Sequence, residues 1–303
     1  MSPRPPGSGH QRRPALGQRP EAGPAWVAPL VGAHLSDAEF SQLGAFVERR
    51  CGIRVSESKR TMLEGRLRRR LRHLGLDNFG DYCALVLGGK AEDEVALMID
   101  EVTTNKTDFF REPQHFNYLT SHAIPALQRE GQRELRCWSS ACSSGEEPYT
   151  LAMVLAEASL STPGLRWQIL ASDISTEMLD LARSATYRED RIEPVPELLR
   201  KRYLLRRRDG AAQVRIVPQL RDKVRFRQIN LLDRDYLLGG PLEVVFCRNV
   251  FIYFRKELQA AILDRFCRAL VPGGYLFLGH SETIQGFDVP LVQVAPTVYR
   301  KKI

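Results

Sequence analysis

The segment CWSSACSSGEEPYTLAMVL, residues 137–155, holds the residues whose types and spacing most directly suggest chemistry. It reads as a short apolar strand, a turn of small residues and a helix with Pro148 in its first turn. Nucleotide-binding folds place a glycine-rich phosphate loop at such a turn. Here Gly145 is followed by Glu146 and Glu147, which would repel a phosphate. A cationic ligand without phosphate fits better, and an ordinary strand–helix connection with solvated glutamates is the alternative.

Three further segments end predicted strands with polar residues. Ligands of open α/β sheets bind at the carboxyl ends of the strands, so these residues are candidates for the same site. Asp173 closes the apolar strand of WQILASD, where it can accept hydrogen bonds from ribose hydroxyls or cap the following helix. Asn230 closes RQIN, where a plain turn residue is the alternative. Arg248 and Asn249 follow the buried run LEVVFC, and this pair is harder to explain as a mere connection.

The elements that must position these residues fall into two parts. Residues 34–110 are predicted to form a small all-helical domain, which begins at the capping box SDAE. Residues 111–303 alternate strands and helices, which predicts an α/β fold with a Rossmann-like parallel sheet covered on both faces. A basic, β-prone stretch at about 200–222 is predicted as a small β insertion. The predicted strands of the large sheet are 135–139, 167–173, 224–230, 242–247 and 275–279, with a strand pair at the end of the chain.

Composition excludes several classes of protein. No apolar run approaches the ~20 residues that a membrane-spanning helix needs. Residues 1–33 are rich in Pro, Gly and Arg, lack the apolar core of a signal peptide, and are expected to be a disordered tail. The six cysteines include no CxxC pair, so neither a zinc site nor a disulfide framework is suggested. We expect no metal and a reducing, cytoplasmic location.

The positive charge is concentrated in two segments. The whole chain has a net charge of +8, whereas residues 54–73 alone carry +6 and residues 200–227 carry +9. The body of the protein is therefore acidic, and the two basic segments suggest a surface for an acidic partner. Arg66, Arg69 and Arg70 lie off the leucine stripe of a predicted helix and are candidate docking residues. A solvated basic helix face is the alternative.

The combination of these motifs, in this order, resembles the S-adenosylmethionine-dependent methyltransferases of the Rossmann-like class. More narrowly, it is similar to the CheR family of chemotaxis receptor methyltransferases. S-adenosylmethionine (SAM) carries a sulfonium cation and an adenosine but no phosphate, which would explain the acidic turn. The resemblance covers about residues 34–300 and is carried by the motifs TTNKTDFFREPQHF, WSSACSSGEEPYTLAM, ASDIS, NLLD, FCRNVFIYF and PGGYLFLGHSE.

The resemblance implies roles for individual residues. Arg111 and Tyr253 would lie beside the transferred methyl group as the catalytic residues. The cofactor contacts that it implies are Asn105, Thr107 and Arg111 at the methionine and sulfonium end, Glu147 at the amino group, Asp173 at the ribose, Asn230 and Leu231 at the adenine, and Arg248 and Asn249 completing the pocket.

The implied reaction transfers a methyl group from SAM to glutamate side chains of chemoreceptors, giving methyl esters and S-adenosylhomocysteine for adaptation in chemotaxis-type signalling. A free glutamate has a pKa of about 4.3 and is ionised at neutral pH, so the reaction needs orientation rather than a strong base. The implied partner is the cytoplasmic helical domain of chemoreceptors. We expect a cytoplasmic monomer that neither binds nucleic acid nor inserts into a membrane.

Two features depart from the family pattern, and two other functions remain open. Lys106 stands where family members usually carry an apolar residue, and the insertion lacks the glycine-rich loop of members that also bind a receptor's C-terminal pentapeptide. A nucleic-acid methyltransferase would use the basic segments on a phosphate backbone, although RNVFIYF replaces the Asn/Asp-Pro-Pro-aromatic tetrad of base-amino enzymes. A non-catalytic adaptor of the same fold is the other alternative, against which the complete set of motif residues weighs.

Overall fold

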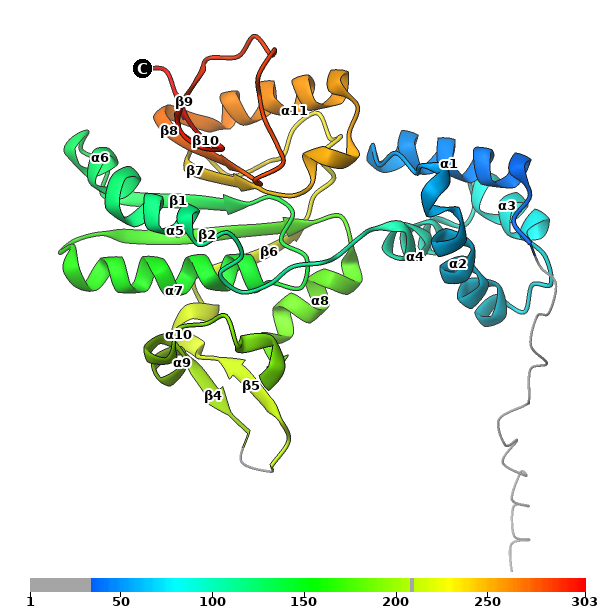
Figure 1. Ribbon diagram of the computed structural model, residues 1–303, viewed down its shortest axis with the longest axis horizontal. Helices are drawn as coiled ribbons and strands as arrows, with labels where there is room; N and C mark the ends of the chain where they lie inside the picture. The colour runs from blue at the N-terminus through cyan, green and yellow to red at the C-terminus, as the bar shows by residue number, and fades with distance from the viewer. Residues whose placement is uncertain (1–33, 208–209) are drawn as a thin grey trace, which may run out of the picture.

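The computed structural model describes residues 34–207 and 210–303. Figure 1 shows a helical unit at the N-terminal end of the described chain and a larger α/β unit, joined by an extended segment. The predicted disordered tail, residues 1–33, lies outside the described residues. Among the helices that the structure describes, none has the length and apolar character to span a lipid bilayer.

The helical unit begins at the capping box that the sequence predicts. The Ser36 hydroxyl accepts from the backbone N–H of Glu39, and the Glu39 carboxylate accepts from the N–H of Ser36 at 2.8 Å. Gly52, with φ of 75°, ends the first helix in the left-handed conformation that glycine favours. The predicted all-helical character of this unit is confirmed: it contains α1 (Asp37–Cys51), α2 (Arg60–Leu74) after a short 3-10 turn (Glu57–Lys59), α3 (Phe79–Leu87) and α4 (Glu92–Val102).

The α/β unit is built on a seven-stranded, mostly parallel sheet. Its strand order is β6-β2-β1-β7-β8-β10-β9, and the antiparallel pairs are those of β10 with β8 and with β9. The chain winds outward from β1 in both directions, so the order reverses between β1 and β7, where such sheets bind ligands. The strands are β1 (Glu134–Ser139), β2 (Arg166–Asp173), β6 (Val224–Gln228), β7 (Leu242–Cys247), β8 (Leu270–Leu278), β9 (Leu291–Ala295) and β10 (Val298–Lys301).

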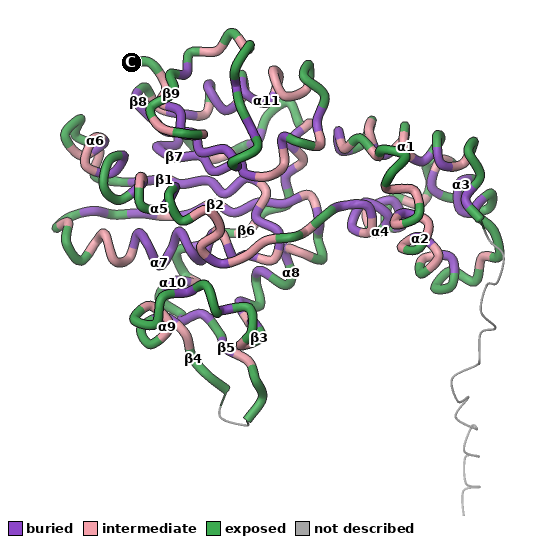
Figure 2. Tube along the Cα trace, viewed as in Figure 1, coloured by how far each residue is buried: buried purple, intermediate pink, exposed green. Residues whose placement is uncertain are grey.

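Helices cover both faces of this sheet, which explains why β7, at its centre, is buried along its whole length (Figure 2). One apolar core joins the sheet to α7 (Glu146–Ser161) and to the helical segment that precedes β1. The other core joins the opposite face to α11 (Lys256–Ala269). The helical segment before β1 consists of α5 (Gln114–Tyr118), a π-helical turn (Leu119–Ala123) and α6 (Ile124–Arg129).

The predicted β insertion is a separate three-stranded antiparallel sheet with the order β3-β5-β4. The insertion starts before the predicted range of 200–222, because β3 precedes that range in the chain and pairs with β5. A three-residue strand carries too little pattern to be seen in the sequence, and it forms only through this pairing. The insertion contains β3 (Thr186–Arg188), a 3-10 turn (Glu189–Ile192), α9 (Glu197–Tyr203), β4 (Leu204–Arg206), β5 (Gln213–Ile216) and α10 (Pro218–Arg221).

The helical unit contacts the α/β unit near the carboxyl ends of the strands. The buried Asp100 of α4 lies at the start of α8 (Thr176–Ser184), and the hydroxyl of Thr176 donates to its carboxylate at 3.4 Å. Burial raises the pKa of Asp100, although hydrogen bonds from Ser175 and from the first turn of α8 oppose this effect. A carboxylate at a helix N-terminus also interacts favourably with the helix dipole. Asp100 therefore helps to hold the helical unit against the sheet beside the candidate site.

We expect Gly145→Ala to lower the free energy of unfolding by about 2 kcal/mol or more, measured by urea denaturation. Gly145 has φ of 98°, and a Cβ there would lie 2.8 Å from the Tyr187 hydroxyl and 2.9 Å from the Ala182 Cβ. Gly131→Ala is the matched control, because Gly131 has φ of 88° and no heavy atom within 4 Å of the added Cβ. Equal losses in the two variants would show that close packing at Gly145 is unimportant.

Candidate active site

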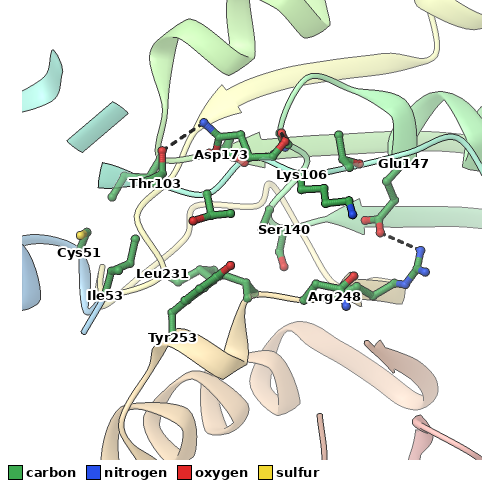
Figure 3. Close-up of a pocket in the computed structure, with 18 of the residues that line it drawn as sticks. Cys51, Ile53, Thr103, Lys106, Ser140, Glu147, Asp173, Leu231, Arg248 and Tyr253 are labelled. Atoms are coloured by element: carbon green, nitrogen blue, oxygen red, sulfur yellow. Dashed lines mark hydrogen bonds and ion pairs between the residues drawn. The ribbon is translucent and has the colours of Figure 1, made fainter. Parts of the chain in front are cut away.

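A cavity opens where the strand order reverses, at the carboxyl ends of β1, β2 and β7 (Figure 3). It holds about 900 Å³ of empty space including its mouth, which is within the range of small-ligand pockets. The helical unit contributes to its wall, and so do the segment that joins the two units and the loops that follow the strands. Every residue that the sequence analysis placed at the cofactor or the methyl group lines this cavity: Asn105, Thr107, Arg111, Glu147, Asp173, Asn230, Leu231, Arg248, Asn249 and Tyr253.

Arg248 joins three segments of the chain at one end of the cavity. Its guanidinium is 2% exposed and follows β7 directly. Nη1 donates to Glu147 Oε2 at 3.0 Å, and Nη2 donates to Glu112 Oε2 at 3.0 Å and to the carbonyl of Arg111. The guanidinium carbon also lies 5.5 Å from the centre of the Phe116 ring, a favourable cation–π distance. Arg248 thus fixes the start of α7 and the joining segment relative to the sheet.

The two carboxylates that share Arg248 differ in their pKa values. Burial raises the pKa of Glu147, and the charge of Arg248 and a hydrogen bond from the Ser139 hydroxyl only partly oppose this effect. Burial also acts on Glu112, but there Arg248 and Asn249 outweigh it and the pKa is lowered. Glu112 therefore stays ionised and acts as the counter-ion of Arg248. Glu147 lines the cavity, and a cationic ligand in contact with it would favour its ionised form.

Glu282 positions the loop after β7, a role that the sequence analysis missed. Its buried carboxylate accepts the backbone N–H groups of Gly279 at 2.6 Å, Asn249 at 2.9 Å and Phe251 at 2.7 Å. These bonds hold Asn249 at φ of 59°, and its side-chain amide donates to Glu112 Oε1 at 3.3 Å. The GHSE motif carries Glu282, but only the folded chain shows that this carboxylate serves a loop some 30 residues earlier.

Asp173 lies at the end of β2 with its carboxylate held by backbone donors. Oδ2 accepts the N–H of Ser143 at 2.8 Å and Oδ1 accepts the N–H of Ser175 at 3.0 Å. Burial raises the pKa of Asp173, although these backbone N–H groups oppose the rise. The cap of α8 is the hydroxyl of Ser175, which accepts from Met178, so the interpretation of Asp173 as that cap is wrong. Asp173 instead faces the cavity with lone pairs to spare for hydroxyl donors.

Residues 105–107, here called the strap, form part of the cavity wall, and side chains from elsewhere in the chain hold their backbone. Three consecutive backbone carbonyls of the strap each accept a hydrogen bond from a side chain elsewhere in the chain. The pairs are Asn105 with the Ser143 hydroxyl at 3.0 Å, Lys106 with Arg111 Nη1 at 3.0 Å, and Thr107 with Arg191 Nη2 at 2.5 Å.

Arg191 belongs to the insertion and was not predicted as a site residue. In addition to the strap, its Nη2 donates to Glu146 Oε1 at 2.8 Å, and Glu146 is 1% exposed. The first acid of the GEE turn is therefore paired with Arg191 and does not line the cavity. The acidic turn thus offers the cavity one carboxylate, that of Glu147, where the sequence suggested two.

The remaining site residues occupy the mouth and the side walls. The Asn230 amide donates to the Arg50 carbonyl at 2.7 Å, so this side chain ties the loop after β6 to the end of α1. Leu231 is buried beside it and adds an apolar wall. The Tyr253 ring lies 4.6 Å from the ammonium of Lys59, and its hydroxyl has no hydrogen-bond partner within the described chain. That hydroxyl is available to a ligand.

The three arginines predicted for docking are engaged with α4 to different degrees. Arg70 makes a two-point contact with the buried Glu94, at 2.6 and 3.0 Å, and its side chain is 13% exposed. Arg66 donates to the Glu101 carbonyl at 2.6 Å, and Arg69 pairs with the Glu101 carboxylate at 2.6 Å while staying 59% exposed. Arg70 therefore faces α4, which supplies its counter-charge, and it is mostly covered. A docking role for these residues stays a prediction.

His115 lies near Arg248, and its side chain is almost completely buried from solvent. One ring nitrogen, Nε2, contacts the Thr297 hydroxyl at 2.9 Å. Burial, and then the positive charge of Arg248, lower its pKa from the ordinary 6.5 to about 4. Glu112, His115 and His280 bring possible metal-ligand atoms within 4.8 Å of one another. The guanidinium bound to Glu112 opposes a metal cation there, so we assign no metal to this group.

At the switch point of this sheet, the turn after β1 presents Glu147 where nucleotide-binding folds carry a glycine-rich phosphate loop. A parallel sheet that receives a cationic nucleoside in this way defines a SAM-dependent methyltransferase. Comparisons with known families agree with this class. The CheR methyltransferase all-alpha domain matches residues 38–103, and the CheR methyltransferase SAM binding domain matches residues 105–299. The chain belongs to the CheR methyltransferase family, and SAM is its cofactor.

Relatives of known function support the assignment over most of the chain. The chemotaxis protein methyltransferase of Escherichia coli K12 is 41% identical over 266 residues, which are 88% of this chain and 91% of that protein. Chemotaxis protein methyltransferase 2 of Pseudomonas aeruginosa is 42% identical over 267 residues, covering 88% and 94%. A solved TehB-like SAM-dependent methyltransferase from Corynebacterium glutamicum is 11% identical, with 63% of this chain and 94% of that chain covered. Its TM-score is 0.33.

Stability should fall as the pH is lowered from about 6.5 to about 4, because the unfolded chain protonates His115 in this range while the folded protein does not. The stability that neutral His115 provides is thus present above pH 6.5 and lost toward pH 4, by up to about 3 kcal/mol. Urea unfolding of His115→Gln across this range should show a flatter pH profile than the wild type. The exposed His122→Gln variant is the control. An unchanged slope in His115→Gln would contradict the assignment.

Proposed function

We propose that this protein uses SAM to methylate glutamate side chains of chemoreceptors, forming methyl esters and S-adenosylhomocysteine in chemotaxis-type adaptation. The observation that carries the proposal is that the ten residues to which the resemblance gives a role at the cofactor or the methyl group all line one cavity in a CheR-family chain. The named relatives are chemotaxis methyltransferases that match the chain along both of its units. A match along both units supports a shared function and not merely a shared fold.

The chemistry of the cavity fits the cofactor. Asp173 and Glu147 supply carboxylates, whereas a phosphate would find no glycine-rich loop and would be repelled. Apolar walls from Ile174, Ile229 and Leu231 suit a planar base. We assign Asp173 to the ribose hydroxyls, Glu147 to the amino group, and the loop after β6 to the adenine. When bound, SAM supplies an activated methyl group on a positively charged sulfur.

The side chains of this site would orient an incoming carboxylate rather than activate it. A glutamate side chain is already ionised at neutral pH, so no group must remove a proton. Arg111 uses one N–H on the Lys106 carbonyl and keeps other donors for ligands. The free hydroxyl of Tyr253 can donate a second hydrogen bond. These contacts would hold the reacting oxygen close and in line, which is the main requirement of a displacement reaction.

Substrate recognition is assigned to the helical unit, residues 34–110, and methyl transfer to residues 111–303. The partner we propose is the cytoplasmic helical domain of chemoreceptors, approached by this protein as a cytoplasmic monomer. Arg69 and the exposed Arg54 are cations of the helical unit that can meet an acidic surface. Docking of this kind should weaken as salt is added.

A nucleic-acid methyltransferase and a non-catalytic adaptor are the competing functions. The family of the chain and the names of its relatives favour a protein substrate over DNA or RNA. The complete set of cavity residues, with the free Tyr253 hydroxyl, favours a catalyst over an adaptor. Incubation with labelled SAM and either receptor fragments or DNA distinguishes all three, because only the proposed activity yields a base-labile methyl ester on protein.

Arg111→Ala should reduce the rate of base-labile methyl ester formation on receptor fragments by about a hundredfold or more while the protein stays folded. The substitution removes the guanidinium beside the reacting carboxylate and its bond to the strap. Circular dichroism and thermal unfolding verify the fold. Arg129→Ala, a change at an exposed arginine of α6 outside the cavity, is the control. Wild-type turnover by Arg111→Ala would refute the assigned role.

Glu147→Gln should weaken binding of S-adenosylhomocysteine about 10- to 100-fold, because the amino group of the ligand loses an ionised acceptor. Isothermal titration calorimetry measures this directly. Glu157→Gln changes the same residue type on the same helix, away from the cavity, and should leave binding unchanged. If Glu147→Gln bound the ligand as tightly as the control, the amino group would have to be placed elsewhere.

A further inference from the structure

The strap holds Lys106 in a fixed position at the wall of the cavity. Its own carbonyl is bound by Arg111, and the carbonyls on both sides of it are bound by Ser143 and Arg191. A backbone supported at three successive residues cannot shift without breaking at least one of these bonds. The origin of the Lys106 side chain is therefore set by the fold, and only its four-carbon chain can move.

The ammonium group of Lys106 has no partner among the residues that the structure describes. Figure 3 shows its side chain extending into the cavity, and the residue is exposed. Nowhere in the described ranges does its side chain have a hydrogen-bond or ion-pair partner. Of the other cations that line the cavity, Arg248 is buried in contact with Glu147 and Glu112, and Arg111 uses one donor on the strap and keeps the rest for ligands. Lys106 is the cation of this lining whose side chain has no partner among the described residues.

An anionic substrate needs such a charge. A glutamate side chain that enters the cavity approaches the carboxylates of Glu147 and Asp173, which repel it. The same acids suit the cationic cofactor, so the site must attract two ligands of opposite charge. We propose that the Lys106 ammonium receives the carboxylate of the substrate and selects it over a neutral amide. This inference rests on the proposed function and makes Lys106 a specificity-determining residue.

The charge changes of the reaction determine which kinetic constant Lys106 controls. One carboxylate oxygen forms a bond to the methyl carbon while the bond from that carbon to sulfur breaks, and the electron pair of the broken bond stays on sulfur. No proton is gained or lost, and the negative charge of the carboxylate disappears as the ester forms. Lys106 therefore attracts the substrate most strongly before the reaction and the neutral ester least. Its contribution belongs to substrate binding and product release rather than to acceleration of the methyl transfer.

Lys106→Met should raise the KM for a receptor fragment about tenfold or more while kcat falls less than threefold or rises. The dissociation constant for S-adenosylhomocysteine should stay within about twofold of the wild type, since Lys106 is assigned to the substrate carboxylate. Lys106→Arg keeps the charge and should restore most of the substrate affinity. Lys90→Met, which removes an exposed cation outside the cavity, is the matched control for net charge and should behave like the wild type.

The possible results of these experiments distinguish a failure of this inference from a failure of the proposed function. If the wild type formed no methyl ester, the proposed function itself would fail. If the wild type were active and Lys106→Met kept its KM for the receptor fragment, only the role of Lys106 would be overturned. A loss of S-adenosylhomocysteine affinity without a change in receptor KM would also overturn it, because Lys106 would then serve the cofactor's own carboxylate.

Discussion

The rest of this site depends on the ion pairs and hydrogen bonds that the buried guanidinium of Arg248 makes. Arg248 lies at the end of β7. The sheet order places β7 beside β1, and the chain leads from β1 into the GEE turn. Its bonds to Glu147, Glu112 and the Arg111 carbonyl bring three segments together. A buried ion pair adds little net stability, whereas loss of one member leaves an unpaired buried charge that costs about 3–5 kcal/mol. The value of Arg248 is therefore in the geometry that it imposes.

That geometry gives neighbouring groups distinct tasks. Glu112 is held ionised as a counter-ion, and Glu147 carries a raised pKa at the edge of the cavity. Glu282 holds the loop after β7, and Arg191 of the insertion holds the strap from outside. The acids prepare the site for a cation, and the supported strap presents a free ammonium for an anion. A cavity that must receive both a sulfonium and a carboxylate needs this separation of charges.

Much of the fold and many of the site residues could be predicted from the sequence because the signals are local. Asp173 and Arg248 each follow an apolar run, and parallel strands carry such residues to one edge of a sheet. The residue pattern alone does not separate Glu146 from Glu147, since adjacent helix residues point about 100° apart and the packing of α7 decides which one meets the cavity. The family resemblance, not the pattern, selects Glu147. Arg191 and Glu282 act on distant segments, and the acids of α4 that neutralise Arg70 are likewise remote in sequence. Long-range pairings of this kind leave no periodic pattern.

We infer that acids at the rim of the sheet, arranged around Arg248, receive a cationic nucleoside without phosphate. A crystal structure of the protein with S-adenosylhomocysteine tests it most directly. We predict that the ligand lies in the cavity, with its ribose hydroxyls within hydrogen-bond distance of Asp173 and its amino group within the same distance of Glu147. The contacts of Arg248 with Glu147 and Glu112 should be unchanged. Binding of the ligand outside this cavity, or an Arg248 released from both carboxylates, would contradict the account.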